Sequence, residues 1–91
     1  IIDDYCFKAC SKLEKIEIPT CLIQLRKSVF SRCVSLENII IPKYVTSLGE
    51  LCFYECTKLS KIVFLGEINK IGWGTFQYCS SLKEIRRIFG S

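Results

Sequence analysis

The chain has 91 residues, a net charge of +4, 49% hydrophobic residues and no histidine. A chain of this length forms one domain, and no apolar run approaches the roughly 18 residues of a membrane-spanning helix. Lysines, arginines and acids are interspersed, so the clustered basic stripe that nucleic-acid binding needs is missing. We therefore expect no nucleic-acid partner and no direct membrane insertion of this segment.

One stretch occurs four times at a spacing of 23 residues. Its copies are FKACSKLEKIEIP from Phe7, FSRCVSLENIIIP from Phe30, FYECTKLSKIVFL from Phe53 and FQYCSSLKEIRRI from Phe76. Phe, Cys, Leu and Ile recur at the same positions in every copy, which predicts stacked repeats whose equivalent side chains lie on top of one another. We divide the chain into repeats of about 1–20, 21–43, 44–66 and 67–91 within a single domain. We expect this domain to be a fragment of a longer array, with neighbouring repeats beyond it.

The first two repeats contain the same order of predicted elements. Apolar and small residues from Asp3 to Cys10 have the spacing of one or two turns of helix. Alternation from Ile16 then predicts a short strand that Pro19 ends, because proline cannot donate to a ladder. In the second repeat, 26–33 is the helical side and 36–41 the strand.

The third repeat adds a second, shorter strand to this order. Residues 44–48 are rich in β-branched side chains, and Gly49 then turns the chain into a helical side over 50–56. The main strand of this repeat is expected over 59–64. Parallel strands would then stack at about 4.8 Å per repeat.

The fourth repeat departs from the pattern at its strand, which we expect over about 82–88. Arg87 occupies a column that is apolar in the other repeats, and Ile88 replaces the proline. Either a bulge moves Ile88 inward or this last strand is frayed.

The columns define the fold class. A period of 23 residues lies in the 20–29 range of leucine-rich repeats. We predict an α/β repeat solenoid with about four rungs, parallel β-strands on one face and short helical turns on the other. The pattern F-x-x-C-x-x-L-x-x-I-x-I-P followed by V-T-S-L-G, most complete from Phe30 through Cys56, resembles the BspA-like leucine-rich repeat. That resemblance implies a binding or structural role without catalysis, as in bacterial surface proteins and the surface antigens or adhesins of parasitic protists.

The seven cysteines are an odd number, which fits no closed disulfide framework. Four of them, Cys10, Cys33, Cys56 and Cys79, occupy one repeat column, and we expect buried free thiols. Zinc binding is less favoured, because a structural site needs four converging ligands. Without histidine the usual Cys/His nucleophile cannot form, so we predict no enzyme, no cofactor and no metal site.

The outward positions of the predicted strands are acidic in the first two repeats and basic in the last two, with apolar residues between. Such a surface suits a protein partner of opposite charge gradient, although scattered exposed apolar residues are also normal. The residues that we assign to this partner-binding face are Glu14, Glu17, Glu37, Ile40, Lys61, Val63, Lys83 and Arg86.

Tyr54, Trp73 and Tyr78 predict a secondary aromatic patch on the other side, since their columns are otherwise polar or small. Exposed Trp and Tyr are typical of interface anchors. They would serve equally well to cover the end of the array or to meet a further repeat.

Two functions follow. The first is non-catalytic protein recognition within a surface antigen or adhesin, with a protein partner of unidentified kind. The alternative is an intracellular structural or scaffold component of a large assembly. Family resemblance favours the cell surface, whereas free cysteines favour a reducing compartment.

Overall fold

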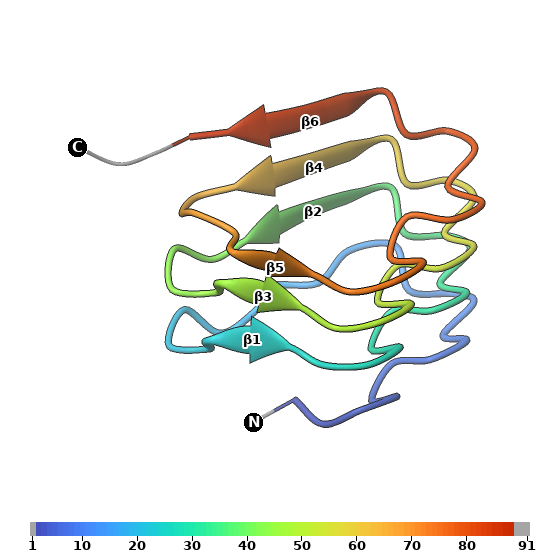
Figure 1. The fold of residues 1–91 in the computed structure, drawn as a ribbon. Helices are drawn as coiled ribbons and strands as arrows, with labels where there is room; N and C mark the ends of the chain where they lie inside the picture. Colours follow the sequence, from blue (N-terminus) through green and yellow to red (C-terminus); the bar gives the residue numbers. More distant parts are fainter. Residues whose placement is uncertain (1, 89–91) are drawn as a thin grey trace.

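The fold is described by a computed structural model over residues 2–88 (Figure 1). Its secondary structure consists of short strands, which form two three-stranded parallel sheets with the orders β1-β3-β5 and β2-β4-β6. Those residues contain no helix, and hence none that could cross a membrane. The strands are β1 (Gln24–Leu25), β2 (Asn38–Ile41), β3 (Ser47–Leu48), β4 (Lys61–Phe64), β5 (Lys70–Ile71) and β6 (Glu84–Arg87).

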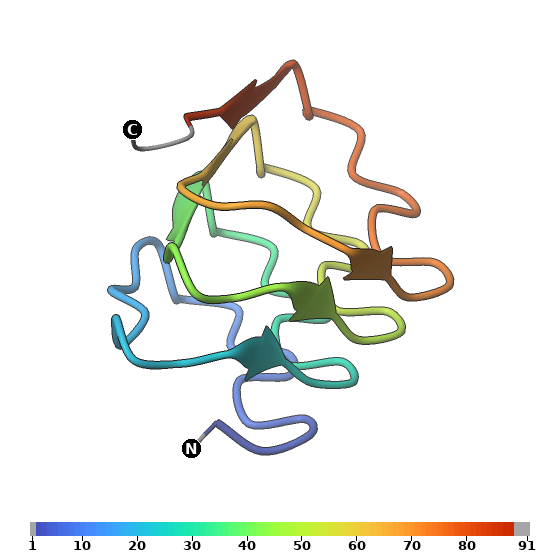
Figure 2. The same ribbon diagram turned by 60° about the vertical axis from the view of Figure 1, so that its left-hand side comes forward.

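The strand register follows the sequence repeat. Ile39 pairs with Ile62, 23 residues later, and Ile62 pairs with Ile85 after the same interval. Leu25, Leu48 and Ile71 are paired in the same way in the smaller sheet. Figure 2 shows the resulting stack of repeats from a second direction. The prediction that residues 23 apart lie on top of one another is confirmed.

The core consists of columns of identical side chains. The rings of Phe7, Phe30, Phe53 and Phe76 stack nearly parallel, with successive centroids 5.5, 5.4 and 5.8 Å apart. Phe30 and Phe53, in the middle of the stack, have no solvent-exposed surface. Each repeat contacts only the repeats before and after it, so burial of these large aromatic side chains is the main term that favours its folding.

The predicted helical turns are wrong. Each repeat instead makes two tight turns here, because two residues per repeat have positive φ, which interrupts a right-handed helix. Backbone N–H groups between these turns donate to the next repeat, for example from Phe30 to Cys52 O at 2.9 Å and from Phe53 to Thr75 O at 3.0 Å. We call these stretches the turn segments; their positive-φ residues are Tyr5 and Ala9, Ser28 and Arg32, Leu51 and Glu55, and Gly74 and Tyr78.

The strand predictions hold in part. Main strands are present in the second, third and fourth repeats, each four residues long. The first repeat has no strand over 16–18, where one was predicted. The second, shorter strand expected in the third repeat is β3, and equivalent strands β1 and β5 flank it.

The last strand is neither bulged nor frayed at Arg87. Arg87 pairs with Phe64 in unbroken register, and the N–H of Ile88 donates to Phe64 O at 2.8 Å. Arg87 is exposed, and Ile88 is not moved inward, because half of its surface remains exposed. The main-chain ladder therefore fixes this strand even though its sequence departs from the pattern.

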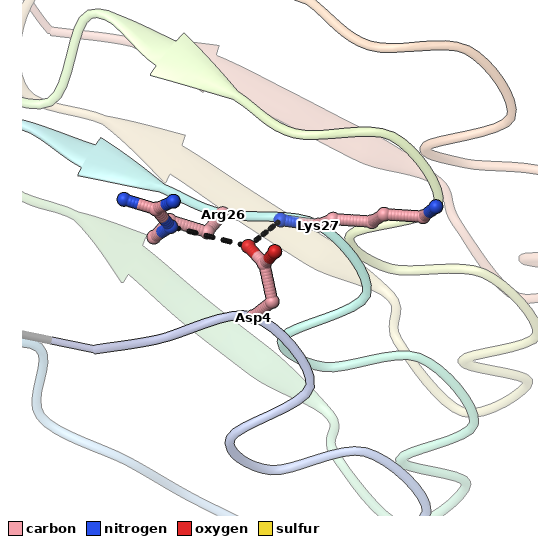
Figure 3. Close-up of polar contacts among 3 residues, drawn as sticks. All are labelled: Asp4, Arg26 and Lys27. Atoms are coloured by element: carbon pink, nitrogen blue, oxygen red, sulfur yellow. Dashed lines mark hydrogen bonds and ion pairs between the residues drawn. The ribbon is translucent and has the colours of Figure 1, made fainter.

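A carboxylate joins the first repeat to the second at the turn segments (Figure 3). Asp4 Oδ1 accepts hydrogen bonds from Arg26 Nε at 3.1 Å and from the Lys27 backbone N–H at 3.2 Å. The side chains of Asp4 and Arg26 are both nearly half exposed, so this pair contributes modestly to stability.

Candidate functional site

The partner-binding face predicted from the sequence divides into two parts. Ile40, Val63 and Arg86 are direct neighbours on β2, β4 and β6, because the register pairs Ile40 with Val63 and Val63 with Arg86. Glu17 precedes Ile40 by 23 residues and so occupies the same column of the repeat. The two residues also line one cavity at the edge of β2. We call Glu17, Ile40, Val63 and Arg86 the strand-face row.

The strand-face row is apolar at its centre and charged at its ends. Ile40 is 56% exposed, which is high for a large aliphatic side chain, and Val63 is partly exposed. Glu17 and Arg86 are both exposed and carry opposite charges. Arg86 Nε donates to Glu84 Oε2 on the same strand, so part of its charge is already compensated.

The remaining predicted residues lie beside this row. Lys61 is on β4, between Asn38 and Glu84 in the register. Glu37 and Lys83 immediately precede β2 and β6 and line a shallow depression of about 380 Å³. Glu14 is joined to Glu37 only through the backbone, by an N–H of Glu37 that donates to Glu14 O at 3.5 Å.

A larger cavity opens next to Ile40, between residues 15–20 and β2. Its volume is about 670 Å³, within the range of roughly 300–1,000 Å³ that is usual for ligand sites. Isoleucine side chains from both repeats line it, namely Ile16, Ile18, Ile39 and Ile40. We call this cavity the edge groove.

The structure also brings together the aromatic patch. Tyr54 and Tyr78 make an edge-to-face contact with centroids 5.6 Å apart, a favourable arrangement of aromatic rings. Trp73 is 72% exposed and lines a cavity of about 300 Å³ together with Tyr54. Arg32 lies 5.9 Å from the Tyr54 ring centroid and forms an ion pair with Glu55 at 3.0 Å.

Comparison with known proteins identifies the family. The family profile described as BspA type leucine-rich repeat region (6 copies) matches residues 1–88. The chain belongs to this family. Among solved structures, a leucine-rich cell surface protein from Faecalibacterium prausnitzii A2-165 resembles it with a TM-score of 0.90 at 32% identity, over 97% of this chain and 23% of that one. The chain thus spans about a quarter of that protein's length. A comparison with curated proteins gives no match.

The cysteine column of this BspA-type repeat has a main-chain partner. The thiols of Cys33, Cys56 and Cys79 each donate to the carbonyl of the phenylalanine 26 residues earlier, at 3.1 Å in every case. Thiols are weak donors, and each of these carbonyls also accepts the backbone N–H of the Cys three residues after it, so the thiol adds a second hydrogen bond that links successive repeats. The column is therefore explained by packing and hydrogen bonding.

Burial sorts the seven thiols of the BspA-type repeat into groups. Cys33, Cys52 and Cys56 are buried as predicted, and desolvation raises the pKa of Cys33 to about 11 and that of Cys52 to about 12. Burial raises the pKa of Cys56 further, and that of Cys79 as well. The expectation of burial is wrong for Cys6 and Cys21, which are exposed in the first repeat and at the start of the second; Cys10 and Cys79 are partly buried.

Sequence reasoning missed the residues of the edge groove. Ile16, Ile18 and Ile39 occupy columns that predict core, and a strand in the first repeat would have covered them. It also missed Lys8, Arg32 and Gln77 in the aromatic cavity. The sequence did contain one indication that these residues lie together, because Lys8, Tyr54 and Gln77 share a column of the BspA-type repeat.

Proposed function

We propose that this chain is a non-catalytic recognition segment, whose strand-face row binds a protein partner as part of a larger surface antigen or adhesin. One observation carries the proposal: exposed Ile40 and partly exposed Val63 are adjacent in the register, between a carboxylate and a guanidinium. An apolar centre within a charged rim is the usual anatomy of a protein interface.

Its similarity to a leucine-rich cell surface protein supports the surface setting. That protein is about four times as long as this chain, which supports our proposal that the chain is one domain within a longer array. Partner affinity would come from contacts distributed along the row, with Ile40 and Val63 as its centre and Glu17 and Arg86 fixing the orientation.

The experiment compares immobilised wild-type chain with the double variant Ile40→Asp/Val63→Asp. Proteins retained from the surface extract of candidate target cells are identified by mass spectrometry, and the affinity is then measured with the purified partner. We expect the double variant to lose at least roughly tenfold in affinity, about 1.4 kcal/mol, because it places two carboxylates in the apolar centre. Ile23→Asp, at an isoleucine that is 64% exposed outside the strand-face row, is the matched control and should bind as the wild type does. Undiminished binding by the double variant would remove the strand-face row from the interface.

The alternative of an intracellular scaffold is favoured by one observation, the free thiols of exposed Cys6 and Cys21. Oxidising compartments tend to convert accessible thiols to disulfides. The redox state of these cysteines in the protein isolated from its native cells separates the two functions. Reduced Cys6 and Cys21 would favour the scaffold, and oxidised or blocked thiols would favour the cell surface.

A further inference from the structure

Most of the main-chain hydrogen bonds that join the first repeat to the second lie at the turn segments. At the turn segments, backbone N–H groups of Tyr5, Phe7 and Ala9 donate to carbonyls of the second repeat at 2.9, 3.0 and 2.8 Å. The Phe7 ring stacks on Phe30 with centroids 5.5 Å apart. Figure 3 shows the further contact of Asp4 with Arg26 and Lys27. This side of the first repeat is therefore held as firmly as the later repeats.

The strand side differs. Residue Glu37 donates to Glu14 O at 3.5 Å, and within residues 2–88 no backbone hydrogen bond follows between residues 15–18 and β2. In the later repeats the same positions form the continuous ladder of β2, β4 and β6. The edge groove opens where this pairing stops.

Unpaired main-chain groups of β2 face the edge groove. The carbonyl of Ile41, the last residue of β2, accepts a hydrogen bond from the N–H of Leu65 at 3.1 Å, so it faces β4. Alternate residues of a strand direct their N–H and C=O to opposite sides. Asn38 and Ile40 consequently direct theirs away from β4, into the edge groove. A free strand edge of this kind is a template for another strand.

The side chains define what such a strand must carry. Ile16, Ile18 and Ile39 make the walls of the edge groove apolar. The charged side chains in its lining are exposed Lys15 and Glu17, one of each sign. An incoming segment therefore needs apolar side chains toward the walls and polar side chains toward the rim.

We infer that an extended segment of the partner protein, with alternating apolar and polar side chains, adds as a strand to the free edge of β2 within the edge groove. Main-chain hydrogen bonds to Asn38 and Ile40 supply pairing, and the isoleucine walls supply selectivity, as in other cases of strand addition. The inference rests on the proposed function, because it names the kind of segment that the strand face recognises.

The chain's own residues 15–18 are the competing occupant. Ile16 and Ile18 stand 23 residues before Ile39 and Ile41, so a shift of this segment onto β2 would continue the sheet in register. Opening this segment breaks no main-chain ladder, although it exposes the buried side chain of Ile18. Occupation by the partner and closure by residues 15–18 are thus mutually exclusive.

The experiment uses the 91-residue chain and a synthetic six-residue peptide in which isoleucine alternates with lysine, capped at both ends. Two further peptides carry N-methyl groups at the isoleucines or at the lysines. Each N-methylation removes the donors along one edge of the peptide strand and leaves its side chains unchanged. We expect the parent peptide to bind, and at least one methylated peptide to bind roughly tenfold more weakly, because two hydrogen bonds are lost.

Variants of Ile40 test the same pairing from the protein side. Ile40→Pro removes the groove-facing donor, and proline is tolerated at an edge strand whose N–H faces outward. Ile40→Val keeps the donor and is the matched control. We expect peptide binding by Ile40→Pro to be roughly tenfold weaker than binding by Ile40→Val.

Equal binding of all three peptides, or no binding of the parent peptide, would overturn strand addition even if Ile40→Pro proves unfolded. If the peptides fail while Ile40→Asp/Val63→Asp still abolishes partner binding, the strand-face row remains the interface and only the edge groove is excluded.

Discussion

The rings of Phe30 and Phe53 are 5.4 Å apart between centroids and inclined by only 7°, although 23 residues separate them in the sequence. The same two residues supply carbonyls to the thiols of Cys56 and Cys79. Ring stacking and thiol donation thus recur together in successive repeats. This pair of columns links successive repeats at the turn segments.

Replacing Phe53 with alanine should destabilise the chain severely. The Phe53 side chain is completely buried and is stacked on both faces. Phe→Ala in such a site reduces the free energy of unfolding by about 3–5 kcal/mol. Chemical denaturation followed by circular dichroism measures the loss. Tyr44→Ala is the control, because Tyr44 is 60% exposed, and it should change stability by less than about 0.5 kcal/mol. Similar effects of the two substitutions would mean that the Phe column is not the core.

Gly49→Ala should also be strongly unfavourable. A Cβ at Gly49 would lie 2.5 Å from the backbone carbon of Arg26 in the preceding repeat, where the neighbouring atoms cannot rotate away. Overpacking of this kind reduces stability by about 1–3 kcal/mol or more. Arg26 occupies the same column one repeat earlier. Arg26→Ala loses only the exposed ion pair with Asp4, so it should reduce stability by about 0–1 kcal/mol. Thermal melting of the two variants gives the comparison, and a Gly49→Ala chain as stable as the wild type would contradict the close stacking here.

The thiols should react in two classes. Cys6 and Cys21 are exposed, whereas Cys33, Cys52 and Cys56 are buried. Only the thiolate is nucleophilic, so burial that raises the pKa of Cys33 to about 11 suppresses its reaction as well as its access. Alkylation of the native chain followed by peptide mapping should label Cys6 and Cys21 first and the buried three only in denaturant. Labelling of Cys52 as rapid as that of Cys21 would show that the core opens readily.

Alkaline pH should destabilise the fold through Cys52. Burial raises its pKa from 9.0 to about 12, so above pH 9 the unfolded chain releases a proton that the folded chain retains. The contribution of the protonated Cys52 thiol to the free energy of unfolding is fully present below pH 9. Above pH 9 it declines by about 1.4 kcal/mol per pH unit, until the folded thiol itself ionises near pH 12. Cys52→Val removes the ionisable group and copies Val29, which occupies the same column. Denaturation between pH 8 and pH 11 should show a smaller slope for the variant; identical slopes would exclude Cys52 as the source.

The repeat columns made most of the core predictable. A column that is Phe, Cys, Leu or Ile in all four copies has no other simple explanation than stacking, and Leu36, Leu59 and Ile62 are fully buried as expected. The outward alternation of Ile40 and Val63 was predictable for the same reason, because successive residues of a strand face opposite sides.

The turn segments could not be predicted in the same way. Phe and Cys three residues apart have the spacing of a helix, yet the residue before each Cys is in the left-handed region in all four repeats. Ala9, Arg32, Glu55 and Tyr78 carry no glycine or asparagine signal for that conformation, which the hydrogen bonds between repeats stabilise instead. The missing strand of the first repeat is likewise a matter of pairing, since Ile16 and Ile18 occupy the same columns as Ile39 and Ile41 of β2.

Partner recognition by the strand-face row requires that Ile40 and Val63 lie side by side on adjacent parallel strands. Nuclear Overhauser contacts between the methyl groups of these two residues measure that relationship directly in solution. We expect a strong contact between Ile40 and Val63, since the register pairs them. Its absence, or a contact of Ile40 with Lys61 or Phe64 in its place, would show a different register and remove the row on which the proposed function depends.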